Sequence, residues 1–78
     1  GRLLAVAVSE TGWPAALGVR AGKGVLLAGP RFSARQTPEL FGSITVRGDG
    51  AVLVAAGALG VWRSTDRGEN WSLTHKTS

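Results

Sequence analysis

The stretch from Gly60 to Trp71 constrains the fold of this 78-residue chain more than any other. Apolar residues lead into it, and a turn-rich centre then interrupts them. Four residue types stand at spacings i, i+2, i+4 and i+7, namely Ser64, Asp66, Gly68 and Trp71. An Asp side chain accepts hydrogen bonds from backbone N–H groups a few residues further on, and Gly adopts a positive φ without steric cost. The stretch therefore predicts a tight hairpin that is closed from inside, with Trp71 beginning the return strand.

These four residues match the Asp box, Ser-x-Asp-x-Gly-x-x-Trp, at every position over residues 64–71. The segment resembles a blade of the Asp-box (BNR-repeat) β-propellers, which include sialidases and sortilin-type receptors. From Leu40-Phe41-Gly42 through Trp71 it is most similar to the photosystem II assembly-factor type of propeller. The resemblance implies an all-β fold of antiparallel four-stranded blades, in which the box is a structural turn away from the active face.

The C-terminal half of the sequence predicts one full blade over residues 40–78. Residues 43–47 alternate between apolar and polar types, as expected of a strand with one buried face. Gly48-Asp49-Gly50 predicts a hairpin turn, and residues 51–56 are apolar on both faces, as in a covered central strand. Residues 61–64 and 71–75 complete four antiparallel strands in up-and-down order.

The N-terminal half predicts only a partial blade, over residues 1–29. The apolar run 3–8 fits a buried strand, Pro14 is expected to stop regular pairing, and residues 17–29 fit a hairpin. That hairpin has an echo downstream, since Val-Arg, a Gly-rich turn and Val-Leu-x-Ala recur between residues 46 and 55. Residues 30–39, bracketed by prolines, fit a linker.

Size and charge limit the partners. A chain this small buries a modest core, and without cysteines it has no disulfide or thiolate metal site. The additional stabilisation that such a chain needs must come from tight β packing, from a partner or the remainder of a larger propeller, or from self-association into a homo-oligomer. The net charge of +4 is dispersed, without the basic run of a nucleic-acid site, and no apolar run is long enough for a membrane helix.

Enzymatic chemistry finds little support in the sequence. Retaining sialidases use a tyrosine nucleophile, and this chain contains no tyrosine. Ser64 has no neighbouring base, and His75 is the only histidine, so neither a hydrolase nucleophile nor a metal site is expected. We therefore expect no catalytic residue, no metal and no cofactor.

Three residues are candidates for contact with a ligand or a partner. Trp13 lies beside Pro14 and outside any clear strand, which makes it the best candidate for an exposed binding aromatic. Trp62 is expected in a strand that faces a neighbouring sheet, so core packing is favoured over ligand stacking. Arg63, the next residue, is the third candidate.

The leading hypothesis is a non-enzymatic propeller segment that acts as a structural or protein-interaction scaffold and assembles into a multi-blade ring. The alternative is a carbohydrate-binding module, in which Trp13 and nearby arginines hold a glycan. A further alternative is a designed or recombined propeller fragment. Defined self-assembly without ligand favours the first hypothesis, and glycan binding without self-association favours the second.

Overall fold

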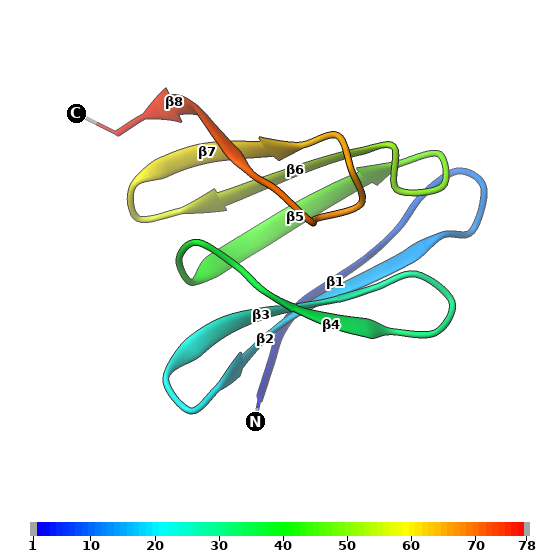
Figure 1. Cartoon of the computed structure of the whole chain (residues 1–78), viewed down its shortest axis with the longest axis horizontal. Helices are drawn as coiled ribbons and strands as arrows, with labels where there is room; N and C mark the ends of the chain where they lie inside the picture. The colour runs from blue at the N-terminus through cyan, green and yellow to red at the C-terminus, as the bar shows by residue number, and fades with distance from the viewer. Residues whose placement is uncertain (1, 78) are drawn as a thin grey trace.

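The computed structural model describes residues 2–77 and is all-β, as expected. The N-terminal sheet contains β1 (Arg2–Val8), β2 (Pro14–Arg20), β3 (Lys23–Ala28) and β4 (Ser33–Gln36). The C-terminal sheet contains β5 (Phe41–Arg47), β6 (Val52–Gly57), β7 (Gly60–Ser64) and β8 (Ser72–Lys76). Each sheet is antiparallel with its strands in sequence order, and Figure 1 shows the two sheets as separate layers. This arrangement is consistent with propeller blades.

The N-terminal sheet has a fourth strand that the sequence did not predict. β4 lies inside the segment 30–39 that was expected to be a linker, and it pairs with β3 through Ser33 opposite Ala28 and Arg35 opposite Leu26. Its residues do not alternate between apolar and polar types. The strand therefore forms because its backbone pairs with β3, and not because of a hydrophobic pattern of its own. The first sheet is therefore a complete four-stranded sheet and not the expected partial blade. Gly1 and Ser78, the outermost residues of the expected single domain, lie outside the described residues.

Pro14 does not stop the pairing of the strands around it. It is the first residue of β2, opposite Val8 of β1. The first residue of a strand is one of the few places in a sheet where a residue without an N–H group is accommodated. The carbonyl oxygen of Pro14 also accepts a hydrogen bond from the backbone N–H of Gly29 at 2.9 Å.

The C-terminal sheet agrees closely with the expected strands. In β5, Ile44 and Val46 are buried, whereas Thr45 and Arg47 are exposed. Between β5 and β6, the N–H of Gly50 donates to the carbonyl oxygen of Arg47, which closes the expected turn. The central strand β6 was expected to be covered on both faces. It alternates instead between buried and half-buried residues, so one face is covered and the other only partly.

One hydrophobic core lies between the two sheets. The N-terminal sheet contributes side chains from β2 and β3, and the C-terminal sheet contributes side chains from β5 and β6. Its members are Ala15, Leu17, Leu26, Ala28, Phe41, Ile44, Val46, Leu53 and Ala55. The first strands of the two sheets, β1 and β5, also contact each other. No helix in the described part of the chain is long and apolar enough to cross a membrane.

Candidate functional site

The turn between β7 and β8 is closed by the hydroxyl and the carboxylate of two of its own side chains. The Oγ of Ser64 accepts hydrogen bonds from the N–H groups of Gly68 at 2.9 Å and Asp66 at 3.4 Å. The same hydroxyl donates to Oδ1 of Asp66 at 2.8 Å. Oδ1 also accepts the backbone N–H of Asn70 at 2.9 Å, and Oδ2 accepts its side-chain amide at 2.8 Å. Ser64 is buried, so its hydroxyl depends on these partners.

These hydrogen bonds stabilise the ionised form of Asp66. The backbone N–H of Asn70 is the largest cause, followed by the Asn70 amide and the Ser64 hydroxyl. Together they lower the pKa of Asp66 from its ordinary 3.8 to about 2. The carboxylate therefore acts as an acceptor in the turn and is not poised to act as a general acid near neutral pH.

The same turn also contacts the N-terminal sheet. Gly68 has a φ of 89°, and a Cβ placed on it would come within 2.4 Å of the side chain of Leu26 in β3. At the rim, the Nε of Arg35 in β4 lies 2.7 Å from Oε1 of Glu69. The turn thus joins the two sheets as well as the strands β7 and β8.

Trp71 and Trp62 pack against the same core residue. The ring of Phe41 lies 5.0 Å from the Trp71 ring in an edge-on arrangement and 6.2 Å from the Trp62 ring. The Nε1 of Trp71 is buried without a hydrogen-bond partner in residues 2–77. Arg63, which follows Trp62 in the sequence, is exposed, and it lines a hollow of about 240 Å³ together with Asp66.

Glu39 is a positioning residue that the sequence did not single out. Its Oε2 accepts hydrogen bonds from Nε1 of Trp62 at 2.7 Å and from the backbone N–H of Leu59 at 3.0 Å. The absence of a side chain at Gly57 makes room for this carboxylate, because a Cβ on Gly57 would lie 2.4 Å from the Cδ of Glu39. The segment between β4 and β5 is therefore fixed to the β6–β7 turn by one side chain.

The turn between β1 and β2 holds the β5–β6 turn of the other sheet. The carboxylate of Glu10 accepts the backbone N–H of Gly48 at 2.8 and 2.9 Å, one distance for each oxygen. The hydroxyls of Ser9 and Thr11 donate to the carbonyl oxygen of the same glycine. Ser9 also accepts the N–H groups of Thr11 and Trp13, the same hydrogen-bond pattern that Ser64 makes in its own turn. The first turn reads Ser-Glu-Thr-Gly-Trp over residues 9–13 and does not repeat the spacing of Ser64, Asp66, Gly68 and Trp71, so this likeness is visible only in the structure.

Trp13 is half-buried in the structure and lies at the junction of the sheets. Its ring lies against Gly29 of the β3–β4 turn and Gly50 of the β5–β6 turn. A Cβ on Gly50 would come within 2.7 Å of the ring. The expectation that Trp13 is an exposed aromatic is therefore wrong, because two glycines let the indole pack between turns of the two sheets.

All five acidic residues are engaged within residues 2–77. Glu10, Glu39 and Asp66 accept the hydrogen bonds described above, and Glu69 pairs with Arg35. Asp49 accepts a charged hydrogen bond from Arg67 at 2.8 Å. In the same part of the chain, no group of three metal-ligating side chains lies close together. The acidic side chains thus hold turns and sheets together.

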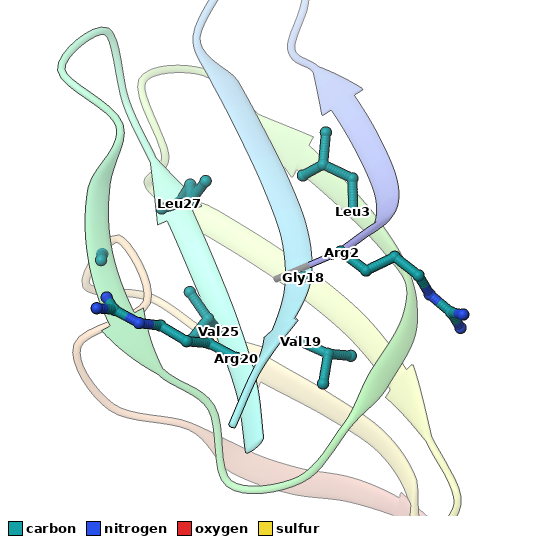
Figure 2. Close-up of a pocket in the computed structure, with 8 residues that line it drawn as sticks. Arg2, Leu3, Gly18, Val19, Arg20, Val25 and Leu27 are labelled. Carbon is teal, nitrogen blue, oxygen red and sulfur yellow. The ribbon is translucent and has the colours of Figure 1, made fainter. Parts of the chain in front are cut away.

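The face of the N-terminal sheet that points away from the core is apolar and uncovered. Leu3, Val6 and Val8 of β1 are 61, 65 and 63% exposed. Beside them a hollow of about 290 Å³ opens on β2 and β3 (Figure 2). The apolar run 3–8 was expected to be a buried strand, but alternation leaves only one of its faces in the core.

Comparison with protein-family models, curated proteins and solved structures finds no match for the chain. Ser64, Asp66, Gly68 and Trp71 are together at the β7–β8 turn, and Arg63 lines a hollow beside it with Asp66. Trp62 joins Trp71 at Phe41, and Trp13 lies apart from them, at the junction of the two sheets. The geometry therefore describes a set of structural junctions and one unpartnered apolar face.

Proposed function

We propose that the chain is a two-blade segment of an Asp-box β-propeller that acts, without catalysis, as a structural or protein-interaction scaffold. The bonding of Ser64 and Asp66 supports the Asp-box interpretation, because both side chains close the turn from inside. The up-and-down order of both sheets supports the propeller interpretation. The engagement of every acidic side chain supports a role other than acid–base catalysis.

One observation carries the scaffold proposal, namely the uncovered face of the N-terminal sheet. Leu3, Val6 and Val8 are more than half exposed and lie in a row along β1. A contiguous apolar patch on a small soluble domain marks an interaction surface. In a propeller each sheet packs on both faces, and here each sheet packs on one.

The occupant that fits this face is the C-terminal sheet of a second copy. The outer face of that sheet carries Val52, Val54 and Ala56 on its second strand, all half-buried, with Val61 beside them on β7. Packing this face on β1 of the next chain would repeat the sheet-to-sheet contact that already exists within one chain. Such a head-to-tail contact closes into a ring, which for propellers of four to eight blades needs about two to four copies.

The test is the mass of the native particle, measured by light scattering over a range of concentrations. We expect a defined multimer for the original chain and a monomer for Val6→Lys, because the lysine places a charge in the centre of the interface. Leu59→Lys is the matched control, since Leu59 is 53% exposed in the β6–β7 turn and lies off the proposed interface. A chain that is monomeric at every concentration would contradict self-assembly and favour further blades of a larger propeller as the occupant.

Carbohydrate binding has less support than the scaffold role. Its best candidate, Trp13, packs against Gly29 and Gly50 and presents little of its ring to a sugar. It stays a prediction, and glycan binding by a monomeric chain would favour it.

A further inference from the structure

The hollow on the outer face of the N-terminal sheet has an apolar floor and a cationic rim. Gly18 of β2, Val25 and Leu27 of β3 and Ala34 of β4 form the floor, and Leu3 stands at one side (Figure 2). Gly18 has no side chain to fill the space, and a Cβ there would come within 2.9 Å of the Arg2 carbonyl oxygen. The close approach of the Arg2 carbonyl therefore excludes a side chain at position 18, and this part of the hollow stays unfilled.

Two arginines border this floor from opposite sides. In Figure 2 the side chain of Arg20 crosses β3 toward β4, and that of Arg2 points outward beyond β1. Neither guanidinium forms a salt bridge within residues 2–77, where the carboxylates of all five acidic residues are engaged elsewhere. Arg20 thus offers several N–H donors beside an apolar surface without a counter-ion from its own chain.

We propose that this hollow binds a small amphipathic carboxylate, with its alkyl chain on Val25 and Leu27 and its carboxylate on the guanidinium of Arg20. Mostly apolar pockets with a few directed polar groups are typical of small-molecule sites. An arginine beside such a floor binds a carboxylate in a fork geometry that suits its paired N–H groups. The volume of about 290 Å³ is at the lower end for ligand pockets, which favours an alkyl chain of roughly eight carbons.

Ligand and assembly should exclude each other, a consequence that rests on the proposed function. The hollow shares the outer face of the N-terminal sheet with Val6, where the second copy is proposed to pack. A ligand that binds only the uncovered face shifts the equilibrium toward the free chain. The carboxylate would therefore act as a chemical signal that opens the ring.

The probe is octanoate, titrated into isotopically labelled protein and followed through backbone amide resonances and light scattering. We expect saturable shifts confined to the residues of the hollow and a fall in particle mass toward the monomer. Octanol, which has the same chain without the charge, should bind about ten- to a hundredfold more weakly, since it gives up the hydrogen bonds between two charged groups. Arg20→Gln should lower the affinity for octanoate to that for octanol.

Arg31→Gln is the control, because it removes the same charge from an exposed position in the β3–β4 turn, outside both the hollow and the proposed interface. Equal affinities for octanoate and octanol, shifts spread over both sheets, or no shift with an unchanged mass would each overturn the proposal. Saturable octanoate binding to a chain that is monomeric without it would support the site and contradict self-assembly. An assembly that octanoate neither binds nor dissociates would contradict the site and support self-assembly.

Discussion

Ser64 and Asp66 divide the closure of the β7–β8 turn between a buried hydroxyl and an exposed carboxylate. The hydroxyl accepts two N–H groups and donates to the carboxylate, which turns toward Asn70. Each group therefore satisfies donors that a tight turn would leave without partners. The pairing of a Ser and an Asp at i and i+2 follows from this geometry, since each side chain bonds to N–H groups within the next four residues.

The pH dependence of stability should report the state of Asp66. Its pKa is about 2 in the folded chain and near 3.8 in the unfolded chain, so the unfolded state takes up its proton first as the pH falls. The stabilisation by Asp66 is then fully present above about pH 4 to 5 and is lost progressively as the pH falls toward 2. We expect the difference in unfolding free energy between the original chain and Asp66→Asn to shrink over that range. Denaturant titrations at several pH values measure it, and parallel curves down to pH 2 would contradict the assignment.

At the scale of the element, turns do more than connect neighbouring strands. The β1–β2 turn holds Gly48 through both its N–H and its carbonyl group, and the β7–β8 turn places Gly68 against Leu26 of the other sheet. Turn conformation and the packing of the two sheets are therefore coupled. The loss of stability on substituting a turn residue should therefore contain one contribution from the turn conformation and another from the packing of the sheets.

Gly68→Ala and Gly12→Ala separate these two contributions. The two glycines have nearly the same φ, 89° and 87°, but a Cβ on Gly68 meets Leu26 whereas a Cβ on Gly12 meets open space. We expect Gly12→Ala to cost about 1 kcal/mol, from the left-handed backbone alone. Gly68→Ala should cost about 2–4 kcal/mol, because displacement of the buried Leu26 adds to the same backbone term. Urea unfolding measures both, and equal costs would mean that the turn does not press on β3.

The strands of the C-terminal sheet could be predicted from the sequence because local pattern and pairing agree there. Alternation in β5, the Gly-Asp-Gly turn and the Ser64–Trp71 pattern are each visible within a few residues. β4 carries no such pattern, and its strand exists through pairing with β3. The echo between the hairpins is real in sequence but one strand out of phase, since it matches β2–β3 with β5–β6.

The contacts that join the two sheets and their turns could not be predicted from the sequence, for a different reason. Glu39 reaches Trp62, and Glu10 reaches Gly48, across more than twenty residues of chain. Nothing local distinguishes these carboxylates from solvated surface charges. Trp13 is a similar case, because its burial depends on two glycines that approach it only in the folded chain.

At the scale of the whole molecule, the two sheets share one core and should unfold together. Leu17 from the N-terminal sheet and Leu53 from the C-terminal sheet belong to the same cluster, and both are essentially inaccessible to solvent. Each sheet is covered only on the face that it shares with the other, so neither has a separate core that would keep it folded alone. A two-state transition is the expectation for a core of this kind.

Leu17→Ala tests this dependence, because it changes the N-terminal sheet while two of the three tryptophans, Trp62 and Trp71, report on the C-terminal sheet. Truncating a buried leucine should cost about 2–5 kcal/mol. If the core is shared, tryptophan fluorescence and far-ultraviolet circular dichroism should shift by the same amount in denaturant. The matched control is Leu59→Ala, an exposed position where truncation should cost less than about 0.5 kcal/mol. A fluorescence transition that stays in place while the dichroism transition moves would mean that the C-terminal sheet holds its fold without the other.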